Sequence, residues 1–167
     1  MPFYARPNQL QLDNRGYYMD RRGFYVCYCD GSSFNNNDAR RQLFSGYGCF
    51  FGPGRAISQH SDFDDRYSNT NNFAELFSIV MALRHAVKFG LFYVQVRSDS
   101  TWCVNCLNGE WNPNCHLDLF DEIQYLCGCL NQVEFCFVRR NSEYGHQQAN
   151  ELAQRGASRH QNRFYAN

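Results

Sequence analysis

Three acidic residues occupy positions at which strands end or a helix begins. Asp30 directly follows an apolar run, Asp99 follows a second one, and Glu75 lies in the first turn of an apolar helical pattern. In an open α/β sheet, side chains at the carboxyl ends of neighbouring parallel strands emerge together. Two carboxylates that close raise each other's pKa unless a cation lies between them, and oxygen ligands suit Mg²⁺ or Mn²⁺. The spacing therefore predicts a divalent metal site, and two such ions about 4 Å apart can support phosphodiester hydrolysis.

The same residues also allow a purely structural interpretation. Asp30 and Ser100 follow strand patterns and could cap turns, while Glu75 could interact with the positive end of a helix dipole. The spacing alone leaves both interpretations open, and the choice depends on which elements carry the acids.

The first half of the chain predicts an antiparallel arrangement of strands. Phe24–Cys29 is a continuous aromatic and β-prone run, typical of a central strand buried on both faces, and it ends at a turn over residues 30–32. A second strand is predicted over Ser45–Phe51. The turn at residues 52–54, Gly-Pro-Gly, returns the chain into a third strand over Ala56–Ser61.

The second half alternates strand and helix patterns, which predicts parallel crossovers and hence a mixed sheet with helices packed on it. The first helix has apolar residues at helical spacing and is stopped by Gly90. The predicted elements are, in chain order, a helix over Phe73–Phe89, a strand over Phe92–Arg97, helices over Thr101–Leu107 and Leu117–Leu130, a strand over Val133–Val138 and a helix over His146–Ala157.

The length of 167 residues predicts one domain over residues 23–158, with a flexible N-terminal arm over residues 1–22 and a C-terminal tail over residues 159–167. No apolar run is long enough to span a bilayer, and none near the N-terminus resembles a signal peptide. The arm lacks the amphipathic pattern of a mitochondrial address. We therefore expect an intracellular protein, cytoplasmic or nuclear, with no membrane partner.

The charge balance does not by itself indicate a nucleic-acid partner. The formal net charge is zero, whereas a strongly basic domain would have argued directly for nucleic acid. Every basic residue except Lys88 is arginine, a side chain that suits phosphate and pairs equally well with surface carboxylates.

Nine cysteines are an odd number, and several lie inside apolar patterns, so reduced and buried thiols are expected rather than a disulfide framework. A zinc site could be drawn from Cys103, Cys106, Cys127 and Cys129. We do not favour it, because the second pair has only one intervening residue and both pairs fall within helical patterns.

Four motifs occur in order at the ends of these elements. They are Cys29-Asp30-Gly31-Ser32, the helix start Thr-Asn-Asn-Phe-Ala-Glu-Leu at residues 70–76, Ser98-Asp99-Ser100, and the terminal helix at residues 149–157. Together they resemble the type-1 ribonuclease H family from about Phe24 to Ala157. The resemblance implies an α/β, ribonuclease H-like fold: a five-stranded mixed sheet, three antiparallel strands and then parallel strands, flanked by helices on both faces. It also implies metal-dependent cutting of the RNA strand of RNA–DNA hybrids, leaving 5′-phosphate ends.

The family's site residues can be carried over by position. Asp30 would bridge two Mg²⁺ (or Mn²⁺) ions, Glu75 and Asp99 would each hold one, and Asn150 stands where the family has its fourth carboxylate. These four are the predicted catalytic and metal-binding residues. The predicted substrate-binding residues are Ser32, Thr70, Asn71, Asn72 and Arg140.

Departures from the family pattern leave two functions open. Asn150 lacks the charge of a carboxylate, Arg140 replaces the family's mobile histidine, and His116 replaces the family's phosphate-pocket asparagine. His146 could serve as a proton carrier in place of the missing histidine, or it could be a polar surface residue. The chain is thus either an active endonuclease, with reduced activity, or a catalytically silenced module that binds hybrid or structured RNA or acts as a protein-interaction subunit.

Overall fold

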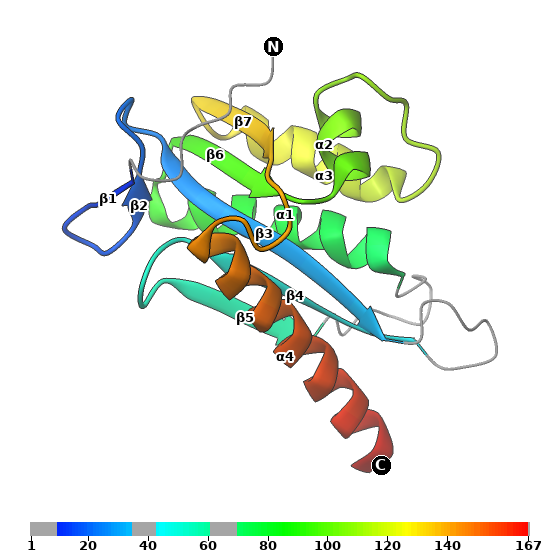
Figure 1. Cartoon of the computed structure of the whole chain (residues 1–167). Helices are drawn as coiled ribbons and strands as arrows, with labels where there is room; N and C mark the ends of the chain where they lie inside the picture. Colours follow the sequence, from blue (N-terminus) through cyan, green and yellow to red (C-terminus); the bar gives the residue numbers. More distant parts are fainter. Residues whose placement is uncertain (1–9, 35–42, 61–69, 167) are drawn as a thin grey trace.

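A computed structural model describes residues 10–34, 43–60 and 70–166 of the chain (Figure 1). Its strands are β1 Gln11–Leu12, β2 Tyr18–Met19, β3 Tyr25–Phe34, β4 Phe44–Phe50, β5 Ala56–His60, β6 Tyr93–Ser98 and β7 Gln132–Phe137. Its helices are α1 Asn71–Phe89, α2 Thr101–Leu107, α3 Leu117–Gly128 and α4 Tyr144–Ala166.

The strands form one mixed sheet, as the sequence predicts. Strands β1 to β5 pair antiparallel in chain order, β6 pairs β3 in parallel, and β7 pairs β6 in parallel. The described sheet has seven strands rather than the predicted five, because the two-residue strands β1 and β2 extend it beside the start of β3. The first and fourth predicted strands are therefore parallel neighbours, which is the condition for Asp30 and Asp99 to emerge together.

Strand β3 is longer than predicted. Residues 30–32 do not form a turn, because β4 continues to pair with β3 as far as Phe34, which lies opposite Phe44. The parallel pairing with β6 ends earlier, at Cys29 opposite Ser98. Asp30 is thus the first residue of β3 beyond the parallel ladder, next to the point at which the chain leaves β6.

Helices cover both faces of the sheet, and glycines allow them to approach closely. A Cβ at Gly31 would lie 2.2 Å from the backbone nitrogen of Glu75 in α1. A Cβ at Gly46 in β4 would lie 2.1 Å from the backbone nitrogen of Ala157 in α4. Side chains at these two positions would push either helix away from the sheet. Figure 1 shows α4 lying across one face and α1 behind the other.

Helix α1 has defined signals at both ends. The hydroxyl of Thr70 accepts a hydrogen bond from the backbone N–H of Phe73, which caps the start of the helix. Gly90 adopts the left-handed conformation, with φ of 68°, and ends it. The predicted helix is confirmed with a start two residues earlier, so Glu75 lies in its second turn rather than its first, held over β3.

The terminal segments differ from the predictions. Residues 10–22 are not a flexible arm: Tyr17 is buried, and its hydroxyl hydrogen-bonds His85 Nε2 of α1 at 3.0 Å. Residues 1–9 lie outside the described residues. The predicted tail is mostly helix, since α4 continues to Ala166, and His160 Nδ1 accepts a hydrogen bond from the backbone of Ser45.

All nine cysteines are free thiols, as expected, and five of them are buried. The four cysteines weighed for zinc are not among the groups of described residues whose ligand atoms lie close together. Within the described residues, no helix combines the length and the apolar character needed to cross a membrane.

Candidate metal centre and active site

Three separate elements carry Asp30, Glu75 and Asp99 to one place. The parallel register of β3 and β6 sets Asp30 beside Asp99. One carboxylate oxygen of each residue and one ring nitrogen of His146 all lie within 4.8 Å of one another. Helix α1 lies directly on Gly31, and the backbone N–H of Gly31 donates to Glu75 Oε2 at 3.1 Å. The convergence that the sequence predicts for the three acids is therefore present in the fold.

Asp30 is the most poorly compensated group of this cluster. Its side chain is 0% exposed, and neither carboxylate oxygen has a hydrogen-bond partner among the described residues. Burial raises the pKa of Asp30 to about 6, and the charge of Asp99 acts in the same direction. Burial and the charges of Asp30 and Asp99 raise the pKa of Glu75 well above its usual range. An unpaired, buried carboxylate is strongly unfavourable, so this arrangement favours binding of a proton or a cation.

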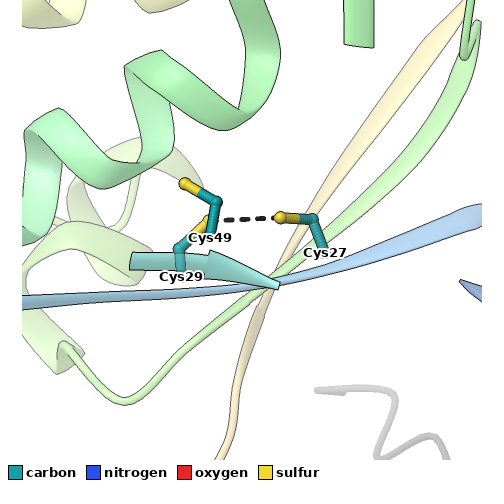
Figure 2. A group of neighbouring side chains, drawn as sticks. All are labelled: Cys27, Cys29 and Cys49. Carbon is teal, nitrogen blue, oxygen red and sulfur yellow. Dashed lines mark hydrogen bonds between the residues drawn. The ribbon is translucent and has the colours of Figure 1, made fainter. Parts of the chain in front are cut away.

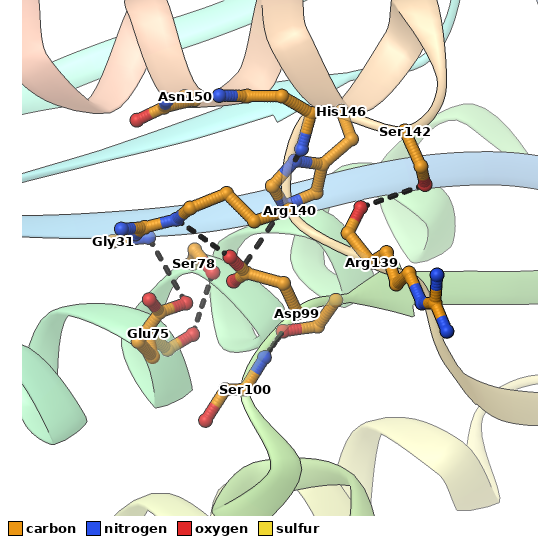
Figure 3. A network of polar contacts seen from close by, with 12 residues as sticks. Gly31, Glu75, Ser78, Asp99, Ser100, Arg139, Arg140, Ser142, His146 and Asn150 are labelled. Atoms are coloured by element: carbon orange, nitrogen blue, oxygen red, sulfur yellow. Dashed lines mark hydrogen bonds and ion pairs between the residues drawn. The ribbon is translucent and has the colours of Figure 1, made fainter.

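The carboxylate of Asp99 is contacted by the side chains of Arg140 and His146. Arg140 Nε donates to Asp99 Oδ2 at 3.0 Å, and His146 Nε2 lies 3.5 Å from Asp99 Oδ1 (Figure 3). Burial alone would raise the pKa of Asp99, but His146 and Arg140 outweigh it and hold that pKa below its usual value. The Arg140 side chain is 62% exposed, so its contact with Asp99 is at the surface of the site.

His146 is not a surface residue, because its side chain, in the first turn of α4, is 0% exposed. Its Nδ1 accepts a hydrogen bond from the backbone N–H of Asn141 at 3.2 Å. A ring nitrogen that accepts cannot carry the proton, so a neutral ring has its proton on Nε2, which faces Asp99. His146 Nε2 has no hydrogen-bond partner among the described residues and lies 3.5 Å from Asp99 Oδ1, and its role as a proton carrier stays a prediction.

Asn150 follows His146 by one turn of α4, but its amide is engaged with neighbouring polar residues. Its Nδ2 donates to Asn141 Oδ1 at 3.3 Å, and its oxygen accepts from Gln154 Nε2 at 3.2 Å. Ligation of a metal by the amide oxygen would require the bond with Gln154 to open. Gln154 is exposed, so water can replace that bond.

A family model described as RNase H matches residues 22–160. The chain belongs to the ribonuclease H family. A curated Ribonuclease H of Schizosaccharomyces pombe is 34% identical over 149 residues, which cover 80% of this chain and 53% of that protein. The chain therefore spans about half the length of this relative.

Solved ribonuclease H structures share the fold. The N-terminal RNase H domain of a Mycobacterium tuberculosis protein is similar with a TM-score of 0.69 and 23% identity, over 82% of this chain and 95% of that one. RNase H1 of Halobacterium salinarum has a TM-score of 0.64 and 23% identity, over 82% and 99%. LC11-RNase H1, isolated from compost and solved with an RNA/DNA hybrid, has a TM-score of 0.65 and 20% identity, over 80% and 96%.

Most of the predicted substrate-binding residues lie on or beside the elements that hold the acids, whereas Arg140 lies between β7 and α4. Ser32 is half-buried two residues beyond Asp30 on β3, and Asn71 and Asn72 are the first residues of α1. The Thr70 hydroxyl caps that helix. Arg140 contacts Asp99 directly. The roles of these residues toward a substrate stay predictions.

Two features of the site were not foreseen from the sequence, namely the burial of His146 and the ion pair between Arg140 and Asp99. A signal for the first was present. Gly145, Ala149 and Ala153 place small residues at helical spacing around His146, and all three are buried against the sheet. That pattern indicates a helix packed closely along the face that carries His146.

Proposed function

We propose that the chain is a metal-dependent endonuclease that hydrolyses the RNA strand of RNA–DNA hybrids. The observation that carries this proposal is the pair of buried Asp30 oxygens without partners, beside Glu75 and Asp99. Membership of the ribonuclease H family supports it. The hybrid bound to LC11-RNase H1 supports the choice of nucleic acid as the partner.

The acid cluster fits divalent cations, because its three carboxylates supply the oxygen ligands that such ions prefer. The two oxygens of Asp30 accept no hydrogen bond from any described residue and are therefore available as ligands. Asp30 would bridge two Mg²⁺ or Mn²⁺ ions, while Glu75 and Asp99 would each hold one and the Asn150 amide would complete the set. Such ions supply an activated water and stabilise charge on the leaving oxygen.

The chain's own polar groups have distinct tasks in this proposal. His146 presents an N–H toward Asp99 from a fixed ring and so orients that carboxylate. Ser32 and Arg140 flank the acids from β3 and from the segment before α4, where they can contact the substrate backbone. The first residues of α1, Asn71 and Asn72, lie at a helix N-terminus, which attracts phosphate.

We infer reduced activity from two features of the site. A neutral amide at Asn150 attracts a cation less than a carboxylate would, so metal affinity falls. Arg140 lies against Asp99 at 3.0 Å and must be displaced, or share the carboxylate, when a cation binds there.

The same two features favour a second candidate function, that of a silenced module. In this alternative Arg140 replaces the cation permanently, and the surface binds hybrid, structured RNA or a protein partner without hydrolysis. The contact between Arg140 and Asp99 is the observation that favours it.

The two functions are separated by incubating the chain with a hybrid whose RNA strand is labelled, first in Mg²⁺ and then in Mn²⁺. We expect cleavage products with 5′-phosphate ends, faster in one metal than the other, and none from Asp30→Asn or Asp99→Asn. If wild type and both variants are equally inert at every protein concentration, the hydrolysis proposal fails. A salt titration of hybrid and double-stranded RNA binding then tests the silenced module.

A further inference from the structure

A second cluster of chemically active side chains lies in the core between the sheet and helix α1. Cys27 and Cys29 of β3 and Cys49 of β4 are each 0% exposed. Their three sulfur atoms all lie within 4.8 Å of one another, and the Sγ atoms of Cys27 and Cys29 are 3.7 Å apart. Figure 2 shows the three side chains on the same side of the two strands. The proposed nuclease chemistry uses none of them.

The register of the sheet fixes this arrangement. Cys27 and Cys29 are two residues apart on one strand and therefore point to the same face. Cys49 lies directly opposite Cys29 in the antiparallel ladder of β3 and β4. Its Sγ also donates to the backbone oxygen of Ser78 in α1 at 3.1 Å, which orients it toward the interior. The three sulfurs are thus held by regular structure and not by a loop.

The spacing of the sulfurs matches three ligands of one central atom. With a bond of about 2.3 Å between sulfur and the central atom, as for zinc thiolates, three sulfurs lie about 4 Å apart in a plane and closer in a pyramid. The separations in this cluster, 3.7 Å for one pair and at most 4.8 Å for the others, need only small side-chain adjustments.

The apolar surroundings restrict the charge of the central atom. The three cysteines belong to the main hydrophobic core. Any net charge on a complex in such surroundings would be strongly unfavourable. Three thiolates around a trivalent centre form a neutral complex, whereas a monovalent or divalent ion would leave negative charge in the core. Zinc is further disfavoured because its structural sites take four ligands.

We propose that Cys27, Cys29 and Cys49 form a binding site for one trivalent thiophilic metalloid, the class to which arsenite belongs. The reaction is a condensation without any change of oxidation state. Each of the three thiols exchanges its S–H bond for a sulfur–arsenic bond, each As–OH bond of arsenous acid breaks, and three water molecules leave. The product joins two positions on β3 to one on β4.

Two consequences follow from the burial of the site. Arsenite can enter only when β3 and β4 separate locally, so binding to the folded protein is slow and accelerates in sub-denaturing urea. The bound atom then links the two strands covalently, so the loaded protein unfolds at a higher temperature than the free protein.

The test uses the full chain with Cys115→Ser and Cys129→Ser, which removes the exposed thiols. It is incubated with sodium arsenite in low urea and dialysed. We expect one arsenic per chain by mass spectrometry, as a gain of one arsenic and a loss of three protons. X-ray absorption should show three sulfur neighbours, and the Tm should rise.

Cys27→Ala or Cys49→Ala in the same background should abolish the tightly held arsenic. Cys103→Ala is the matched control, because Cys103 is equally buried but lies outside the cluster, and it should retain full binding. Arsenic that is absent from the background protein, or retained equally in all three variants, would overturn the proposal. Circular dichroism of each variant establishes that it is folded, and a variant that is unfolded is replaced by the other cluster variant.

Discussion

The uncompensated charge of Asp30 predicts that neutralising this residue stabilises the metal-free protein. The pKa of Asp30 rises from 3.8 to about 6 on folding, a difference of about 2 pH units, which corresponds to about 3 kcal/mol at neutral pH. Asparagine has nearly the same shape and no charge. After about 1 kcal/mol for desolvation of its amide, Asp30→Asn should raise the free energy of unfolding by about 2 kcal/mol at pH 7.

The direction of the Asp30 pKa shift determines how the free energy of unfolding depends on pH. Because the folded-state pKa is higher than the unfolded-state value, the folded protein binds the proton more tightly. The free energy of unfolding contributed by Asp30 therefore falls as the pH rises from about 4 to about 6, and it stays low above that range. Asp30→Asn should remove this part of the pH dependence, and wild type and variant should converge near pH 4.

The assay is urea denaturation with EDTA between pH 4 and pH 8, followed by circular dichroism. Asp99→Asn is a control of opposite sign. Burial would raise the pKa of Asp99, but His146 and Arg140 lower it, so this carboxylate stabilises the fold above its usual pKa. Asp99→Asn should cost about 1 kcal/mol at pH 7. If Asp30→Asn is as destabilising as Asp99→Asn, the description of Asp30 as uncompensated is wrong.

Three further predictions concern the groups around these acids. Mg²⁺ or Mn²⁺ at millimolar concentration should raise the Tm of the wild-type protein in calorimetry and leave that of Asp30→Asn unchanged, because the bridging ligand is lost. Asn150→Asp should lower the metal concentration for half-maximal hybrid cleavage about tenfold, because a carboxylate adds about 1.4 kcal/mol of attraction for the cation at the edge of the site. An unchanged metal dependence would show that residue 150 is not a metal ligand. Gly31→Ala should destabilise the protein by roughly 3 kcal/mol or more, the cost of severe overpacking, because the new Cβ would lie 2.2 Å from the α1 backbone. Gly109 has open space around it, so Gly109→Ala should show only a backbone strain cost of about 1 kcal/mol in the same urea titration.

The sequence predicted the elements and the meeting of the acids, because both depend on local patterns and on general sheet geometry. Apolar runs of strand length marked β3, β4 and β6, and their parallel or antiparallel pairing followed from the connections between them. Capping at Thr70 and Gly90 fixed the ends of α1, and Glu75 follows from that start. The membership of the ribonuclease H family confirms the fold that the four motifs implied.

The predictions failed where contacts between residues far apart in the sequence outweigh the local structural preferences of a segment. Residues 30–32 have a turn-like sequence, yet pairing with β4 keeps them in a strand. Residues 10–22 are polar, yet the Tyr17 ring packs against Phe51 and His85, and the backbone N–H of Tyr18 donates to the carbonyl of Phe51. The position of the Arg140 guanidinium depends on the path of the chain between β7 and α4, and no spacing in the sequence encodes that path.

The choice between nuclease and silenced module depends on the strength of the ion pair between Arg140 and Asp99. The Arg140 side chain is 62% exposed, and an exposed ion pair of this kind contributes at most about 1 kcal/mol. Its displacement would therefore weaken cation binding about fivefold, a loss that millimolar Mg²⁺ can offset. Asp30, by contrast, is buried without a hydrogen-bond partner among the described residues, and its pKa is raised to about 6, so a cation beside it would relieve an unfavourable buried charge. Because the ion pair of Arg140 with Asp99 is weak, we expect Arg140 alone not to exclude a metal ion from this site. Arg140→Gln should consequently strengthen Mg²⁺ binding by no more than about fivefold in a calorimetric titration, and a much larger increase would favour the silenced module.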